Sequence, residues 1–295
     1  MEPKVFNSKD TNVKKFVFEY EDPKGIAEAV LYRYEEYKKR TVICCSVMSG
    51  CPVGCTFCGT GKFFVRNLTA NEIVGQVVSC LNTIDCDTED IKKFQIMFMS
   101  MGEPMMNYDN LEVAIRRLHQ LYPNAQLLVS TSAPANTFEH ISQFIKLSRE
   151  IDKVGLQFSV HETTDENRAK LIPTKTCTLR QIALIGELWA SFVGRKPFYN
   201  YCVHPGKDSL KDAITLVELF KPEVWETTLS VICEKDESVK ASIERQLELI
   251  NDFSEKMKDL GASIRVFNPA GQDDIGGGCG QLWYFQEWLK NNHSK

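Results

Sequence analysis

Two adjoining stretches of the sequence decide the fold: Thr41-Val-Ile-Cys-Cys-Ser-Val47 and Cys51-Pro-Val-Gly-Cys55-Thr-Phe-Cys58. The first is a short run of β-branched and apolar residues, which is typical of a buried strand. The second places three thiols on the loop after this strand. Three thiolates can ligate three irons of a cubane and leave the fourth iron open for an outside ligand. A zinc site without its fourth ligand and three buried thiols are the alternatives.

Downstream of this loop, short β-branched or aromatic runs alternate with longer segments of helical period, which predicts βα units and a parallel sheet. We expect strands over residues 41–47, 94–99, 126–130, 154–160, 197–203, 227–232 and 262–267. We expect helices over residues 70–81, 109–121, 137–147, 178–192, 210–220 and 239–260. Six consecutive βα units predict an α/β fold, a partial TIM-like (β/α)6 barrel with its chemistry at the C-terminal ends of the strands.

Upstream of the first βα unit the pattern changes. Residues 16–20 and 28–34 predict a hairpin, joined by the turn-forming Asp22-Pro23-Lys24-Gly25. We therefore expect residues 1–40 to form a short N-terminal β extension. Residues 41–295 should form the catalytic core.

Composition restricts the class of protein. With 295 residues, 43% hydrophobic and 25% charged, the chain suits one large α/β domain. Eleven cysteines without an export signal indicate metal binding or catalysis in the cytoplasm, where thiols stay reduced. No apolar run is long enough to span a membrane, so no membrane partner is expected. The net charge of −4 gives no global basic field, so we expect no DNA partner and only local contacts to RNA.

The Cys-x3-Cys-x2-Cys pattern, with Phe57 before its last cysteine, resembles that of radical-SAM enzymes. This resemblance implies a [4Fe–4S] cluster on Cys51, Cys55 and Cys58, with S-adenosylmethionine (SAM) on the open iron. Downstream, Met101-Gly102-Glu103-Pro104 resembles the motif that holds the SAM ammonium group, a role that suits an acidic side chain.

Further blocks narrow the resemblance, and they occur in the same order as in one family. They are Asn67-Leu-Thr69, Glu72-Ile-Val-Gly-Gln76, residues 101–107, Ser130-Thr-Ser132, Ser159-Val-His161 and Leu171-Ile-Pro173. Together they resemble the RlmN/Cfr family of radical-SAM methyl synthases, which methylate adenine in ribosomal and transfer RNA, and the resemblance covers roughly residues 8–283. It implies SAM contacts from Phe57, Gly102, Glu103, Ser130, Ser159, Val160 and His161.

Two further cysteines match the catalytic pair of this family: Cys44, and Cys279 in the glycine-rich segment Gly276-Gly-Gly-Cys-Gly280. The resemblance implies that Cys279 is methylated and becomes tethered to the substrate. Cys44 then releases the product and leaves a disulfide intermediate. Glu28 is our candidate for the base that removes the ring proton, with Glu35 or Glu36 as substitutes.

The chain departs from the family pattern in three respects. Members carry a helical N-terminal domain that helps to hold RNA, which we expect this chain to lack. Cys233 stands where the family has an asparagine for the SAM ribose, and Glu234 is a possible replacement. Basic residues form only local patches: Lys14, Lys15, Lys38, Lys39, Arg40, Lys62, Arg66, Lys92 and Lys93.

The leading interpretation is a radical-SAM methyltransferase that transfers a methyl group through Cys279 to adenine carbon 2 or 8 in RNA. An electron donor such as flavodoxin or ferredoxin would be its second partner. One alternative keeps the radical chemistry but acts on a small molecule, a nucleotide or a peptide. The other is a non-catalytic cluster-binding protein, which the pair Cys44 and Cys279 disfavours.

Overall fold

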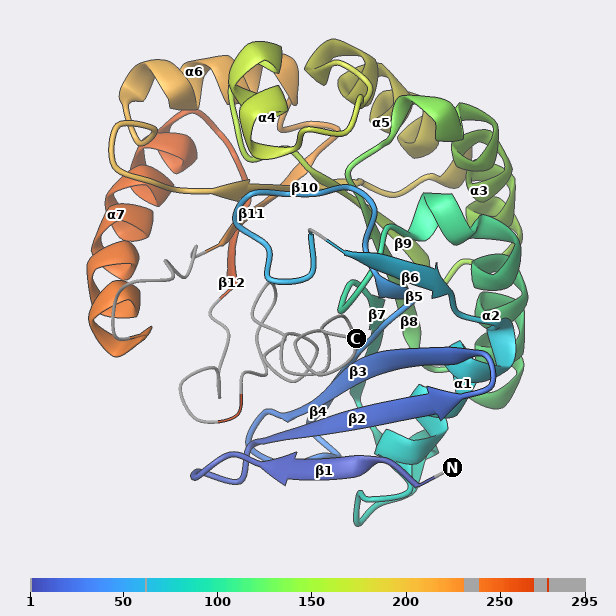
Figure 1. Ribbon diagram of the computed structural model, residues 1–295. Coiled ribbons are helices and arrows are strands. Elements are labelled where there is room, and N and C mark those ends of the chain that lie inside the picture. The colour runs from blue at the N-terminus through green and yellow to red at the C-terminus, as the bar shows by residue number, and fades with distance from the viewer. Residues whose placement is uncertain (1, 62, 231–238, 268–274, 276–295) are drawn as a thin grey trace. The chain divides into compact units, whose positions relative to one another are not determined.

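The computed structural model describes residues 2–61, 63–230, 239–267 and 275 (Figure 1). Within helix α7 it describes side chains only from residue 247. The described residues form two compact units. The first comprises residues 2–61, 63–130, 151–155 and 275, and the second comprises residues 131–150, 156–230 and 239–267. The predicted boundary at residue 40 stays a prediction.

The first unit begins with antiparallel strands and continues with parallel ones. Its strands are β1 (Lys4–Asn7), β2 (Val13–Glu21), β3 (Lys24–Arg33), β4 (Arg40–Cys45), β7 (Lys93–Phe98) and β8 (Gln126–Thr131), in that order across the sheet. Strands β1 to β4 pair antiparallel, which confirms the predicted hairpin, whereas β4, β7 and β8 pair parallel. A separate two-stranded sheet holds β5 (Met48–Gly50) and β6 (Phe64–Asn67).

The two faces of this sheet are buried differently. Helix α1 (Ala70–Leu81) contacts β3 and β4 with its buried residues, among them Ile73 and Val77, and begins at the predicted capping box of Thr69 and Glu72. Helix α2 (Tyr108–Leu121) packs beside it. On the β3–β4 pair, Val30 lies opposite Cys44. The second face carries a cluster of buried side chains, Val13, Val30, Tyr32, Val42 and Cys44, against which Met97, Met99 and Ile275 pack.

The second unit is built from parallel strands and their crossover helices. Its strands follow the order β9 (Val154–Ser159), β10 (Phe198–Cys202), β11 (Glu226–Ser230) and β12 (Ile264–Phe267). Its helices are α3 (Phe138–Glu150), α4 (Asp165–Leu171), α5 (Leu179–Val193), α6 (Leu210–Leu219) and α7 (Val239–Asp259). An aromatic core of Phe158, Tyr199, Phe220 and Trp225 lies beneath these helices.

The predicted strands and helices from residue 41 onward are present, with ends shifted by a few residues. The structure adds short elements that the pattern did not predict, chiefly β1, β5, β6 and the seven-residue helix α4. Elements this short contain too few residues to show a hydrophobic period. The α/β class with a parallel sheet is confirmed. Across the described residues, no helix is long and apolar enough to cross a membrane.

Candidate active site

The three cysteines of the predicted cluster motif lie on one loop between β5 and β6. Backbone hydrogen bonds close this loop, from the Cys51 N–H to the Phe63 carbonyl (2.7 Å) and from the Cys58 N–H to the Cys55 carbonyl (3.2 Å). A Cβ on Gly61 would lie 2.7 Å from the Cys55 carbonyl oxygen, so only glycine fits there. The close packing of this glycine fixes the thiol-bearing loop.

The loop offers soft sulfur donors. Burial raises the pKa of the Cys51 thiol to about 12, and also raises the pKa of Cys55; nearby thiols and Glu103 contribute to both shifts. Iron binding would displace these protons, since a ligating thiol is deprotonated. Nowhere in the described chain do three His, Cys, Asp or Glu side chains converge on a single metal ion. A cubane instead spreads three thiolates over three irons, so the donor set fits an iron–sulfur cluster.

The predicted SAM-binding turn lies beside this loop. Gly102 has a φ of 102°, and a Cβ there would lie 2.6 Å from the Met48 side chain, so the turn requires glycine. Glu103 is buried and its Oε1 accepts a hydrogen bond from the Met105 N–H at 3.1 Å. Its charge raises the pKa of the Cys51 thiol, which places the carboxylate close to the cluster loop. An anion here suits a ligand that carries an ammonium group.

In the second unit, Ser159, Val160 and His161 lie at the C-terminal end of β9, as predicted. The N–H groups of Val160 and His161 both donate to the Asn200 carbonyl, at 3.0 and 3.2 Å. His161 has a φ of 61°, in the left-handed region. Burial, then the charges of Arg168 and His204, lower the pKa of His161 to about 3. The imidazole is therefore neutral and able to accept or donate one hydrogen bond.

Arg168, which the sequence pattern did not single out, holds this strand end in place. Its side chain is buried, and its guanidinium donates hydrogen bonds to five neutral oxygens. The acceptors are the carbonyls of Val160 (3.2 Å), Cys177 (3.2 Å), Ser132 (2.8 Å) and Ser159 (2.8 Å), and the hydroxyl of Thr176 (2.5 Å). The N-cap Thr164 and the first-turn acid Asp165 mark its short helix, but no sequence signal identifies the arginine itself.

The candidate base Glu28 lies on the face of the sheet that carries Cys44. Side chains alternate along a strand, so Glu28 and Val30 share a face, and Val30 is paired with Cys44. Glu28 is fully buried, and its Oε2 lies 2.5 Å from the Nζ of Lys15 on β2. Cys44 is 8% exposed, with its Sγ 4.0 Å from the Met97 sulfur.

The substitutes for Glu28 lie elsewhere. Glu35 is an exposed turn residue with a φ of 64° and is paired with Lys39, and Glu36 is exposed in the same turn. The prediction that Lys15 belongs to a basic surface patch is wrong, because Lys15 is only 1% exposed. The inward position of Lys15 could have been read from the alternation of Val13, Lys15 and Val17 along β2.

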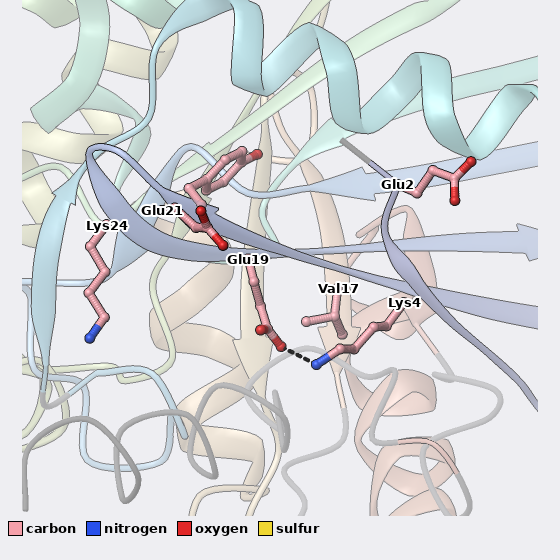
Figure 2. A pocket seen from close by; sticks show the side chains of 7 residues that line it. Glu2, Lys4, Val17, Glu19, Glu21 and Lys24 are labelled. Carbon is pink, nitrogen blue, oxygen red and sulfur yellow. Dashed lines mark hydrogen bonds and ion pairs between the residues drawn. The ribbon is translucent and has the colours of Figure 1, made fainter.

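The structure describes only some of the remaining residues that were predicted to contact SAM or the substrate. Phe57 is half-buried on the cluster loop, and Ser130 is half-buried on β8. Cys233 and Cys279 lie outside the described residues. A surface pocket of about 490 Å³ on β1–β3 contains none of the predicted site residues (Figure 2). It is lined by Glu2, Lys4, Val17, Glu19, Tyr20, Glu21 and Lys24.

Comparison with known proteins identifies relatives that match most of the chain. No protein-family model matches the chain. A probable dual-specificity RNA methyltransferase RlmN from Dictyoglomus turgidum is 31% identical over 284 residues, covering 95% of this chain and 78% of the relative. A protein of the same name from Thermus thermophilus is 32% identical over 281 residues, covering 94% of this chain and 76% of the relative.

Solved structures agree on the fold. A radical SAM methyltransferase from Sphaerobacter thermophilus superposes with a TM-score of 0.77 at 28% identity, covering 95% of this chain and 80% of that one. Streptococcus suis SuiB, at 12% identity and a TM-score of 0.54, covers 78% of this chain and 49% of its own and shares the fold alone. The predicted fold class is thus confirmed, and the likeness implies SAM and an iron–sulfur cluster as cofactors. By sequence, the chain belongs to the RlmN family of dual-specificity RNA methyltransferases.

Proposed function

We propose that this protein is a cytoplasmic radical-SAM methyl synthase that transfers a SAM-derived methyl group through Cys279 to carbon 2 or carbon 8 of adenine in RNA. The observation that carries this proposal is the packing of Ile275 against the cluster of Cys44. Ile275 stands four positions before Cys279 in the sequence. A residue close to Cys279 in the sequence therefore packs against the cluster that contains Cys44, which supports a reaction shared by the two cysteines.

The cofactors would be held by the residues that the sequence motifs predict. Cys51, Cys55 and Cys58 would ligate a [4Fe–4S] cluster. The SAM contacts would come from Phe57, Gly102, Glu103, Ser130, Ser159, Val160, His161 and Cys233. When bound, the cluster and SAM supply the methyl group and the radical chemistry, with electrons from a donor such as flavodoxin or ferredoxin. Glu103 would bind the SAM ammonium group, and the buried neutral His161 would offer a hydrogen bond without adding positive charge.

The chain's own residues would carry the steps that follow methylation of Cys279. Glu28 accepts the proton from the ring carbon to which the Cys279-bound carbon has been joined. The Cys44 thiolate then attacks the Cys279 sulfur, and the bond between that sulfur and the transferred carbon breaks. Its electron pair stays on the transferred carbon, which takes up a proton to become the methyl group of the product, and a Cys44–Cys279 disulfide remains.

RNA as the substrate rests on the family. The relatives from Dictyoglomus turgidum and Thermus thermophilus are both named RNA methyltransferases. Exposed basic side chains near the N-terminal strands, such as Lys38 and Lys39, could contact phosphates, although both pair with carboxylates here. The test below would also detect methylation of a different substrate, namely a free nucleotide, a small molecule or a peptide.

The test is anaerobic reconstitution with SAM that carries a labelled methyl group, followed by mass spectrometry of the peptide that contains Cys279. We expect one labelled methyl on that peptide, and labelled adenine in RNA when RNA is added. Cys279→Ala should abolish transfer, and Cys44→Ala should trap a protein–RNA adduct. Cys86→Ala, at a half-buried thiol with no assigned role, is the control. Methyl transfer by the Cys279→Ala variant would disprove the mechanism, and label on a free nucleotide alone would change the substrate.

A further inference from the structure

We propose that Lys15 is a positioning residue for the reaction, which holds Glu28 as a carboxylate on the face of the sheet that carries Cys44. The proposal rests on the proposed function, because it assumes that Glu28 is the base. It assigns to Lys15 a task that the sequence did not suggest. Lys15 acts through Glu28 and contacts no substrate.

The contact between the two side chains is close and dry. The Nζ of Lys15 lies 2.5 Å from the Oε2 of Glu28, and the two side chains are 2% and 0% exposed. Charged side chains are almost never buried this fully unless they are paired. The pair is therefore built into the sheet and is not a chance contact of two surface chains.

The register of the strands explains how the pair reaches Cys44. Lys15 on β2 lies opposite Val30 on β3, and Val30 lies opposite Cys44 on β4. Glu28 is two residues before Val30, so all of these side chains lie on one face. The ammonium of Lys15 thus sits one strand away from the base and two strands away from the catalytic thiol.

The surroundings make the countercharge necessary. On β2, Val13 and Val17 flank Lys15, and the neighbouring cluster of Val30 and Cys44 is covered by Met97 on β7 and by Met99, which follows β7. Among the described residues of this face, Tyr32 and the Cys44 thiol lie within the cluster, and Tyr34 packs against it. The strand register places further charged residues on the same face, farther from Cys44 or at its edge: Arg40, Lys4, Glu19, Glu21 and Lys24. A carboxylate buried among apolar side chains without a cation takes up a proton. A protonated Glu28 could not accept the ring proton.

A structural role alone is the competing explanation. Buried ion pairs are often replaceable by apolar side chains without loss of stability, so burial by itself does not assign a function. The two explanations differ in which step of the reaction fails. A positioning residue affects the step that uses Glu28, whereas a structural residue affects every step through folding.

The experiment follows the reaction of Lys15→Met in single turnover, at the stages of Cys279 methylation, covalent adduct and methylated product. We expect Cys279 methylation at the wild-type rate, accumulation of the adduct, and product formed about 100-fold more slowly, which is the range of general-base catalysis. Raising the pH should restore product formation in Lys15→Met, because the carboxylate of Glu28 is regenerated. It should not do so in Glu28→Gln. Lys15→Arg, which keeps the charge, should retain most of the activity.

The controls keep a folding defect apart from the proposal. Lys15→Met/Glu28→Gln removes both charges and should fold; it should be no slower than Glu28→Gln alone, because Lys15 acts only through Glu28. Lys4→Met, in an exposed pair on the same sheet, should behave as wild type. A further loss in the double variant, or wild-type product formation by Lys15→Met, would overturn the role of Lys15. An unmethylated Cys279 in the wild-type protein would instead count against the proposed function itself.

Discussion

Each of the two units contains a buried cation, and the partners of the two cations differ. In the first unit, Lys15 faces the single carboxylate of Glu28. In the second unit, Arg168 faces five neutral oxygens, four of which are backbone carbonyls. The lysine is bound to a group that can gain or lose a proton, whereas the arginine is bound to groups that cannot.

This difference separates a chemical role from an architectural one. Guanidinium is planar and offers five donors in fixed directions, which suits several carbonyls at a strand end. Ammonium is a compact charge that can balance one carboxylate. Arg168 therefore fixes the backbone around Ser159 and Val160, while Lys15 fixes the ionisation of Glu28.

The largest effect should come from Arg168→Met. It would leave four buried carbonyls without the guanidinium, at about 1–3 kcal/mol each, so we expect a loss of about 5 kcal/mol or more in the free energy of unfolding. Chemical denaturation would measure this loss. Arg168→Lys, with three donors, should recover only part of it. A loss below about 2 kcal/mol for Arg168→Met would mean that water or other donors replace the guanidinium.

The next largest effect should come from Lys15→Met. Removing one partner of a buried ion pair costs about 3–5 kcal/mol, because the other charge is left uncompensated. The second change Glu28→Gln should recover most of this loss, whereas no single neutral substitution can compensate Arg168→Met. Denaturation of the two single variants and the double variant completes the cycle. If the double variant is as unstable as Lys15→Met, the two charges are not coupled, and Lys15 does not differ from Arg168 in having a single charged partner.

The sequence predicted the elements on which the site is built better than the contacts within it. The three cluster cysteines and Gly102-Glu103 are local motifs, so their positions after strand ends follow from short stretches of chain. Lys15 and Glu28 are 13 positions apart and meet only through the β2–β3 register, which depends on the pairing of whole strands.

Arg168 shows a second reason why part of the site was missed. It lies on helix α4, whose seven residues are too few for a hydrophobic period. Its acceptors are mostly backbone carbonyls, which are the same for every residue type, so no partner side chain reveals them in the sequence. Such contacts become visible only when the strand ends are placed in space.

The pH dependence of stability should be a third, smaller effect, and it belongs to the second unit. The pKa of His161 is about 3 in the folded protein against 6.5 unfolded, so the unfolded chain binds the extra proton between these values. Protonation of the unfolded chain therefore lowers the free energy of unfolding as the pH falls below 6.5. The decrease is about 2 kcal/mol between pH 7 and pH 5.

The matched variant for this measurement is His161→Asn, because asparagine tolerates the left-handed φ of 61° at this position. The difference between wild type and variant isolates the histidine from other groups that titrate in the same range. We expect the wild type to lose more stability than the variant on acidification. Parallel curves would show that His161 is not held neutral by its burial and by Arg168.

The smallest effect on the free energy of unfolding should come from Lys4→Met, which removes a lysine from an exposed ion pair instead of a buried one. Lys4 and Glu19 form an ion pair at 2.6 Å at the edge of the same sheet (Figure 2), but their side chains are 55% and 41% exposed. Water already solvates both charges, so the pair should contribute less than about 1 kcal/mol. That contribution should disappear at about 1 M salt, where the Debye length is about 3 Å, while the loss in Lys15→Met should persist. The measurement is the loss in the free energy of unfolding at low and at high salt. Equal losses for Lys4→Met and Lys15→Met would mean that burial does not distinguish the two lysines. Glu28 would then not depend on its buried cation.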